Sequence, residues 1–311
     1  MYNNVKPIFK WAGSKKKMFE KYDVYFSHFK KKKMENFVDY FGGTGIMSVW
    51  INKNYPDTKI TINEFNSQIF GIYRAIKYDY DNFLHLVNKI DKIYMKMPHL
   101  LDDTLTKDDI NKSERKKFYL SLRNQYANIE NIATKELNTK EAALLYFLMC
   151  NNFNGIWQAR RADNVYFTPF GNGWRKNPLM DEYKDALDDF HNMIINADIV
   201  CGSFEKLNIN IENTVHYFDP PYVNSHTRYS DDAFNINHTK IMIQMMKDLD
   251  NKGSTVIMSN KESDVFSFDN KFTIEKFDVK YTVSSKKSRA VEILVHNISD
   301  ISKHKGLINL I

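Results

Sequence analysis

The chain has 311 residues, of which 43% are hydrophobic and 26% charged, as in an average globular protein. This composition excludes a collagen-like, coiled-coil or wholly disordered chain, and the length predicts about two domains. Lysine and arginine number 44 against 38 acidic residues, a mild excess that permits a polyanionic partner without requiring one. No stretch approaches the roughly 18 apolar residues of a membrane span, and the amino terminus lacks the apolar core of a signal peptide. We therefore expect a soluble intracellular, cytoplasmic protein.

The first 77 residues predict the start of an α/β domain. An apolar run over 37–41 predicts a buried strand that ends at the glycine loop Gly42-Gly43-Thr44-Gly45. Residues 46–54 then predict a helix, and residues 59–63 predict a second strand that ends at Glu64. Strand, glycine loop, helix and strand form one βαβ unit.

The middle of the chain changes character. From about residue 78 to 140 glycine is absent and apolar residues such as Phe118, Leu122 and Tyr126 recur at helical spacing. Residues 141–151 continue as an apolar helix, and residues 154–174, rich in glycine, asparagine, arginine and aromatics, predict an exposed hairpin or ordered loop. We expect an inserted, mainly helical domain at 78–190, between the segments 1–77 and 191–311 of an α/β domain.

The α/β pattern returns near residue 181, with short strands predicted within 194–201 and at 215–218. Helical spacing of Ile241, Met245 and Leu249 precedes a strand at 255–259. Residues 272–283 and 291–295 predict two final strands joined by a basic loop at 284–289. Two cysteines, Cys150 and Cys201, lie far apart in apolar surroundings, and we expect both to be buried free thiols.

Three motifs carry candidate chemistry. The glycine loop follows a strand, and open α/β sheets bind ligands at such strand ends. Glu64, at the end of the next strand, can accept both hydroxyl protons of a ribose. The glycine spacing is not the GxGxxG of dinucleotide-binding proteins, and the alternative is a plain strand-to-helix turn. The Asp219-Pro220-Pro221-Tyr222 turn presents a carboxylate, a backbone carbonyl and a ring that suit a flat heterocycle with an exocyclic amine, or caps a strand. Lys10-Trp11-Ala12-Gly13-Ser14-Lys15 could wrap an adenosine and anchor a carboxylate, or form an ordinary amphipathic turn.

In chain order, the motifs KWAGSK, FVDYFGGTG, NEFN, FNG…TPFG and FDPPY resemble those of the Dam-type DNA adenine-N6 methyltransferases, in particular the phage-encoded Dam-like enzymes. The resemblance covers nearly the whole chain and implies a Rossmann-like, S-adenosylmethionine-dependent methyltransferase fold. It makes 1–77 and 191–311 the catalytic domain and 78–190 the target-recognition domain. It implies site-specific methylation of double-stranded DNA in a bacterial or phage-infected cell, with S-adenosyl-L-homocysteine as product, no metal, and a monomer as the default state.

The resemblance also assigns site residues. The implied catalytic residues are Asp219, Pro220 and Tyr222. The implied cofactor-binding residues are Trp11, Lys15, Asp39, Phe41, Gly43, Gly45, Glu64, Ser203, Phe204 and Asp219. The candidate DNA-binding residues are Arg123, Asn124, Asn154, Gln158, Arg160, Arg161, Lys286, Lys287 and Arg289, with Arg175, Lys176, Asn128 and the run Lys30 to Lys33 as further candidates.

Two departures from the family pattern matter. Ser14 replaces the second glycine of the first motif, and the loop after Asn154-Gly155 is about one residue longer than in the best-known members. Either Arg160 or Arg161 could then read a base, so the target sequence stays open.

The mechanism implied is direct in-line methyl transfer to a flipped-out adenine. Asp219 and the Pro220 carbonyl would accept hydrogen bonds from the amine and localise its lone pair. The alternatives are a cytosine-N4 or RNA methyltransferase and a catalytically silent DNA-binding module. A nicotinamide-dependent oxidoreductase is disfavoured by the missing GxGxxG pattern.

Overall fold

A computed structural model describes residues 5–11, 15–30, 33–98, 107–207, 209, 212–222, 234–283 and 286–299. Within them, one seven-stranded sheet has the strand order β3-β2-β1-β4-β5-β7-β6. The strands are β1 (Asn36–Asp39), β2 (Lys59–Glu64), β3 (Asp198–Cys201), β4 (Thr214–Phe218), β5 (Thr255–Lys261), β6 (Thr273–Val283) and β7 (Lys286–His296). Strands β3, β2, β1, β4 and β5 are parallel, whereas β7 runs antiparallel to β5 and β6. The predicted α/β class is confirmed.

Helices lie at 46–54, within 78–151 and around 241–249, as predicted, and also over 19–26 and 67–78, for which the sequence predicted no particular helix. They are α1 (Phe19–Phe26), α2 (Ile46–Asn54), α3 (Ser67–Tyr78), α4 (Tyr80–Met95), α5 (Lys107–Lys112), α6 (Glu114–Ala127), α7 (Thr139–Cys150), α8 (Leu179–Ile194) and α9 (Ile236–Asn251), with the 3₁₀ helices η1 (Lys15–Met18), η2 (Ser27–Lys30) and η3 (Phe204–Lys206). Helix α7 begins with a capping box between Asn138 and Glu141, an arrangement that satisfies two otherwise unpaired amides. None of the described helices is long and apolar enough to cross a membrane.

The sheet separates two hydrophobic cores, as the alternation of strand side chains requires. Phe37 and Tyr217 face the larger core, which the helices α1, α2, α3, α7 and α8 complete. Val38 and Phe218, one residue further along each strand, face the smaller core beneath α9. Both faces of β1 and β4 are thereby buried, which leaves the ends of these strands as the places where they can present functional groups.

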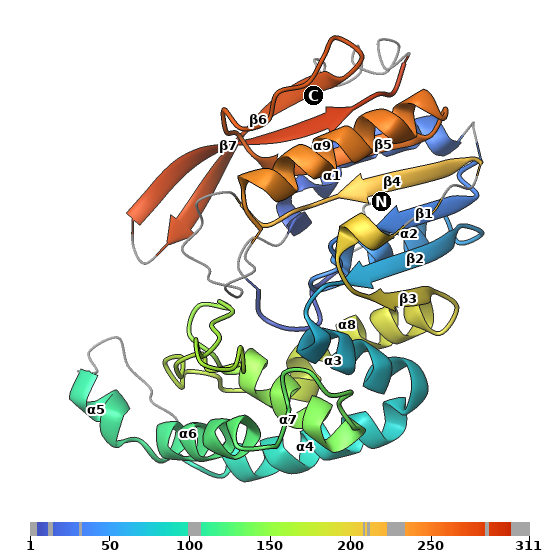
Figure 1. Cartoon of the computed structure of the whole chain (residues 1–311). Coiled ribbons are helices and arrows are strands. Elements are labelled where there is room, and N and C mark those ends of the chain that lie inside the picture. Colours follow the sequence, from blue (N-terminus) through green and yellow to red (C-terminus); the bar gives the residue numbers. More distant parts are fainter. Residues whose placement is uncertain are drawn as a thin grey trace.

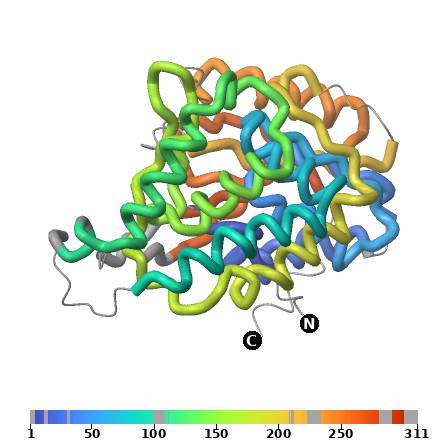
Figure 2. The backbone as a smooth tube through the Cα atoms, turned by 90° about the horizontal axis from the view of Figure 1, so that it is seen from below, coloured from blue at the N-terminus to red at the C-terminus, as the bar shows by residue number. Residues whose placement is uncertain are grey.

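Helices α4, α6 and α7 lie together beyond the β3 edge of the sheet (Figure 1), and Figure 2 shows their teal and green segments in front of the sheet when seen from below. They pack on one another, since α7 contacts α3, α4 and α6. Helix α8 runs through the predicted boundary at residue 190 and packs on α2, α3 and α4. The division into two domains stays a prediction, and a boundary at 190 would cut this helix.

Two local expectations are wrong, and for a third segment the structure decides between the two alternatives. Residues Lys286 to Arg289 belong to β7, paired with Val283 to Lys280 of β6, so the predicted basic loop is a strand. The segment 154–174 holds only isolated bridges, Asn152 with Phe170 and Ala159 with Tyr166, so of the two predicted alternatives, exposed hairpin and ordered loop, it is the ordered loop. Its side chains Trp157 and Tyr166 are buried in the larger core. Cys150 is buried as expected, but Cys201 is exposed because it ends the edge strand β3.

Candidate active site

The motifs meet at the carboxyl ends of β1, β2 and β4. Strand order reverses at β1, between β2 and β4, and such a switch point is where open α/β sheets bind ligands. After β1, the backbone nitrogen of Gly42 donates to the carbonyl of Asn63 at 2.8 Å, which fastens the glycine loop to β2. Gly45 has φ +66°, and a Cβ there would overlap the ring of Phe190, so only glycine fits. The loop is thus fixed from both sides.

Glu64 holds the glycine loop through its carboxylate. Oε2 accepts from the backbone nitrogen of Gly43 and Oε1 from that of Asn66, each at 2.8 Å. Burial raises the pKa of Glu64 to about 7, against the opposing effect of these amide bonds. Of the atoms of the described residues, the nearest to a Cβ added at Gly43 would be Trp11 Nε1, at 3.9 Å. The described residues therefore leave space beside Gly43 and Trp11, next to the Glu64 carboxylate, a setting that suits a ribose.

Asp39 ends β1 and is a structural acid. Its side chain is 1% exposed, and it accepts hydrogen bonds from Ser48 Oγ at 2.9 Å and from the backbone nitrogen of Phe41 at 3.3 Å. Burial raises its pKa to about 7. These bonds join the end of β1 to the first turn of α2, so Asp39 holds both ends of the glycine loop in place.

Aromatic side chains also lie at the carboxyl ends of the strands, just after β3. Ser203 precedes η3, and Phe204 packs against Phe41 and Phe234 with ring centroids 5.3 and 5.9 Å away. Phe41 and Phe234 also meet edge to face, at 5.8 Å. A flat apolar heterocycle fits such a cluster, because aromatic faces and edges attract one another.

Asp219 follows β4 directly and is held by Lys15. The two charged atoms, Lys15 Nζ and Asp219 Oδ1, are 3.1 Å apart, with Lys15 5% and Asp219 23% exposed. Burial alone would lower the pKa of Lys15, but Asp219, Tyr22 and Glu292 raise it, so the ammonium stays charged. Burial raises the pKa of Asp219, which Lys15 counteracts. Asp219 is thus an anchored carboxylate with one accessible side.

Tyr222 and Glu292 complete a closed group of polar atoms around this carboxylate. Lys15 Nζ donates to the Tyr222 hydroxyl at 3.2 Å and to Glu292 Oε2 at 3.4 Å. The Tyr222 hydroxyl donates to Glu292 Oε1 at 2.8 Å, and Lys15 Nζ lies 4.9 Å from the centre of the tyrosine ring. All three N–H donors of Lys15 are directed at protein oxygens, so in this arrangement Lys15 holds the turn after β4.

The Pro220 carbonyl is fixed as well. Asn260 of β5, which is 1% exposed, donates its side-chain amide to this oxygen at 2.8 Å. A carbonyl oxygen has two lone pairs, so the bond from Asn260 uses one of the two.

The loop 154–174 touches the first motif, KWAGSK. Gly155 has φ +65°, and a Cβ there would lie 2.8 Å from the backbone nitrogen of Trp11. Ala12, Gly13 and Ser14 lie outside the described residues. The turn at Asn154-Gly155 and the segment Lys10-Trp11 therefore pack backbone to backbone.

The candidate DNA-binding arginines of this loop, Arg160 and Arg161, and Arg123 of α6 have different surroundings. Arg160 donates from Nε to Asp163 at 2.9 Å and from Nη2 to the carbonyl of Ala127 at 3.2 Å, whereas Arg161 is exposed. Arg123 lies over the ring of Phe167 at 3.8 Å and donates to the carbonyl of Thr168. Arg160 and Arg123 thus support the loop, while Arg161 extends from it.

The remaining candidates are dispersed. Asn124, Asn154 and Gln158 are exposed. Arg175 is 8% exposed and pairs with the buried Asp91, so it braces α4 and cannot reach a phosphate. Lys286, Lys287 and Arg289 are placed by their backbone in β7, and their side chains lie outside the described set, as do Lys31 and Lys32 of the amino-terminal run.

Sequence reasoning missed three residues of this site, Glu292, Asn260 and Tyr73. Tyr73 donates its hydroxyl to the carbonyl of Gly43 at 2.8 Å. For Glu292 a signal existed, because a carboxylate interrupts the apolar run of 291–295, and charged groups are almost never buried unless paired.

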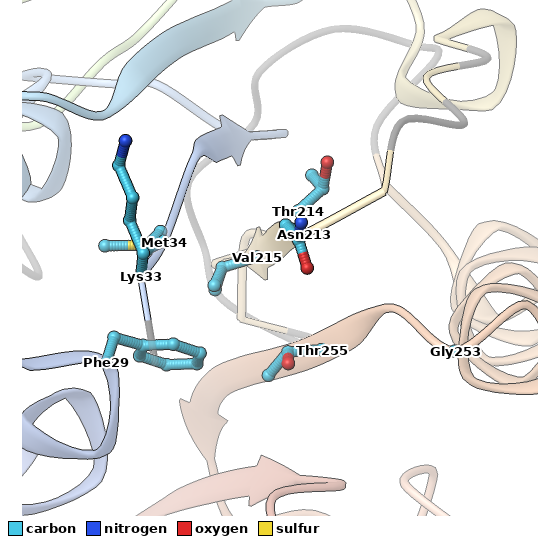
Figure 3. A pocket seen from close by; sticks show the side chains of 8 residues that line it. All are labelled: Phe29, Lys33, Met34, Asn213, Thr214, Val215, Gly253 and Thr255. Atoms are coloured by element: carbon cyan, nitrogen blue, oxygen red, sulfur yellow. The ribbon is translucent and has the colours of Figure 1, made fainter. Parts of the chain in front are cut away.

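A separate pocket of about 30 Å³ lies at the amino ends of the strands (Figure 3). Met34, Thr214 and Thr255 line it, and they precede or begin β1, β4 and β5. It has room for little more than a water molecule, so it is no candidate for a nucleoside.

Comparisons with known proteins agree with this geometry. The model of the D12 class N6 adenine-specific DNA methyltransferases matches residues 11–292. The chain is 26% identical over 265 residues to the Type II methyltransferase M.MjaIII of Methanocaldococcus jannaschii, which covers 82% of this chain and 84% of that protein. It is 26% identical over 306 residues to the Type II methyltransferase M1.LlaDCHI of Lactococcus lactis subsp. cremoris, at 94% and 96% coverage. The DNA adenine methylase of Haemophilus influenzae is 22% identical over 265 residues, at 83% and 80% coverage.

Fold and site together define a methyltransferase of the Rossmann-like class. More narrowly, the chain belongs to the D12 class N6 adenine-specific DNA methyltransferase family. Its activity is methylation of adenine N6 in DNA, which sets aside the cytosine-N4, RNA and nicotinamide alternatives. Membership implies S-adenosylmethionine as methyl donor. Among the described residues, no group of three His, Cys, Asp or Glu side chains is placed to hold a metal ion.

Proposed function

We propose that the chain is a site-specific DNA-methyltransferase (adenine-specific), EC 2.1.1.72, that acts as a monomer on double-stranded DNA in the cytoplasm of a bacterial or phage-infected cell. The observation that carries this proposal is the position of Asp219, a partly accessible carboxylate at the end of β4, held by Lys15 beside the ring of Tyr222.

The residues around the glycine loop fit S-adenosylmethionine. When bound, it supplies the methyl group and leaves as S-adenosyl-L-homocysteine. The open space beside Gly43 and Trp11, the adjacent Glu64 carboxylate and the ring cluster around Phe204 suit a ribose and an adenine. The residues proposed to hold or shape this site are Trp11, Lys15, Asp39, Phe41, Gly43, Gly45, Glu64, Ser203, Phe204 and Asp219. Of these, Asp39 and Lys15 act through the loop and turn that they fasten.

The turn after β4 acts on the adenine amine. Asp219 and the free lone pair of the Pro220 carbonyl accept its two protons, which draws the nitrogen toward tetrahedral geometry and localises its lone pair. The amine is inaccessible within a duplex, so the base is flipped out. Stacking on Tyr222 recovers about 1–3 kcal/mol of the unstacking cost.

Replacing Asp219 tests this function. Asp219→Ala leaves Lys15 paired with Glu292 at 3.4 Å, so the fold should survive with no unpaired buried ammonium. We expect no N6-methyladenine in duplex DNA incubated with this variant and S-adenosylmethionine, when nucleosides are analysed by mass spectrometry. Wild-type turnover by Asp219→Ala would refute the mechanism. A wild-type protein that binds S-adenosylmethionine but transfers no methyl group would instead be the silent DNA-binding module.

A further inference from the structure

Strand β7 places an acidic side chain at the edge of the sheet where the catalytic turn lies. Because β7 runs antiparallel to β5, Glu292 pairs with Lys261, the last residue of β5. Its side chain is fully buried, at 0% exposed. A buried carboxylate destabilises the fold unless it is paired and hydrogen-bonded. Glu292 has such partners, and they are Lys15 and Tyr222.

Both oxygens of Glu292 are directed at residues of the active site. Oε1 accepts from the Tyr222 hydroxyl at 2.8 Å, and Oε2 accepts from Lys15 Nζ at 3.4 Å. Lys15 in turn reaches Asp219 at 3.1 Å. The carboxylate therefore touches the neighbours of the reacting groups, and it fixes the ring on which the base stacks together with the ammonium beside Asp219.

The charges explain why a second carboxylate is useful there. One ammonium is shared between two carboxylates, since Lys15 lies between Asp219 and Glu292. If Glu292 were neutral, Lys15 would be drawn fully toward Asp219. Asp219 would then be a weaker acceptor for the adenine amine, because its charge would be satisfied by the lysine.

We propose that Glu292 is a positioning residue for adenine methylation, which orients the Tyr222 ring and shares the charge of Lys15 so that Asp219 stays available to the adenine amine. This inference rests on the proposed function, because it concerns the same turn. It assigns Glu292 no contact with either substrate.

Two substitutions separate the two effects. Glu292→Gln keeps an oxygen for the Tyr222 hydroxyl but removes the charge that Lys15 shares. We expect kcat to fall about 10- to 100-fold, with the KM for S-adenosylmethionine within about threefold of wild type. The acidic limb of the kcat profile should move to lower pH, since Lys15 then stabilises only the ionised Asp219. Glu292→Ala should in addition alter the fluorescence lifetime of 2-aminopurine at the target position, whereas Glu292→Gln should leave it at the wild-type value.

The matched control is Glu141→Gln. Glu141 is a buried carboxylate that pairs with Lys135 and belongs to the capping box of α7, far in sequence from Glu292. It should keep the wild-type kcat and pH profile. Wild-type kcat and an unshifted profile for Glu292→Gln would overturn the inference. If neither Glu292 variant folds, as judged by circular dichroism, Tyr222→Phe removes the same hydrogen bond, between the Tyr222 hydroxyl and Glu292, by changing its donor. A wild-type lifetime and kcat for Tyr222→Phe would then overturn it.

Wild type and Asp219→Ala are assayed in parallel. Absence of N6-methyladenine with the wild-type enzyme would remove the proposed function. Wild-type activity that Asp219→Ala abolishes and Glu292→Gln leaves unchanged would remove only the role of Glu292.

Discussion

Asn260 donates its side-chain amide to the carbonyl oxygen of Pro220 at 2.8 Å, which joins β5 to the turn that follows β4. The peptide unit that carries this carbonyl continues into Pro221, which has no backbone N–H, so the orientation of this peptide depends on what its carbonyl accepts. Strands β4 and β5 are neighbours in register, with Phe218 opposite Met258. The bond therefore fixes the distance between a rigid strand and the carbonyl that we propose accepts from the adenine amine.

Replacing Asn260 by alanine should slow catalysis more than it weakens DNA binding. The Pro220 carbonyl would lose its buried partner and turn away, and misplacement of one acceptor by about 1 Å can cost roughly 100-fold in rate. We expect kcat to fall about 10- to 100-fold in a methyl-transfer assay at saturating DNA. Asn297→Ala is the control, because Asn297 makes a comparable bond, to the Ser254 carbonyl at 2.8 Å, at the other end of β5. Equal turnover by the two variants would contradict this role for Asn260.

The extent to which sequence reveals this site depends on how local each feature is. The glycine loop and the turn at Asp219 are continuous segments at strand ends, so composition and motif order predicted them. Asn260 and Glu292 reach the site through strand pairing, with Glu292 opposite Lys261, and pairing register cannot be read from one strand. The predicted basic loop failed because polar residues also extend a hairpin beyond its apolar core, as Lys286 to Arg289 do along β6.

The loop arginines also show what only contacts can decide. Sequence left Arg160 and Arg161 equivalent, whereas Arg160 is held by Asp163 and by the Ala127 carbonyl. We therefore predict that Arg161→Ala changes the sequence preference at one base pair, by about 1–3 kcal/mol of discrimination. Arg160→Ala should instead loosen the loop and slow methylation at all sites alike. A randomised duplex library, read for modified adenine by single-molecule sequencing, measures both effects.

Asp163→Ala serves as the matched comparison, because it removes one of the two partners of Arg160 without changing either arginine. It should reproduce Arg160→Ala and leave the preference of Arg161 in place. A uniform loss of activity for Arg161→Ala would contradict base reading by this residue.

The lysines of β7 should act on DNA without regard to sequence. Replacing Lys286 and Lys287 by alanine removes two charges near the hairpin end, where they pair with Val283 and Thr282. We predict weaker binding to every duplex and a salt dependence of log K reduced by about two, because each lysine would otherwise neutralise one phosphate. Binding titrations at several salt concentrations measure this slope. Lys276→Ala on β6 is the control, since Lys276 is already paired with Glu262. If Lys276→Ala changed the salt slope as much per lysine as the Lys286 and Lys287 substitutions do, specific phosphate contacts by these two lysines would be contradicted.

Asp39 should make the stability of the free enzyme depend on pH. Its pKa is raised by burial to about 7 from 3.8 in the unfolded chain. Between these values the folded protein retains a proton that the unfolded chain has lost, so the free energy of unfolding falls as pH rises, by up to about 1.4 kcal/mol per pH unit. Glu64, with a pKa raised to about 7, acts in the same direction above its unfolded value of 4.5.

Asp39→Asn should therefore give a shallower decline of unfolding free energy between about pH 4 and 7, measured by urea denaturation at a series of pH values. Ser48→Ala removes a hydrogen bond that favours the ionised Asp39, so it should extend the decline to higher pH. The two variants thus change the curve in opposite ways, although both alter the same contact. Curves for wild type and Asp39→Asn that run parallel across this range would mean that Asp39 does not titrate there, and that its burial is compensated more fully than the contacts with Ser48 and Phe41 indicate.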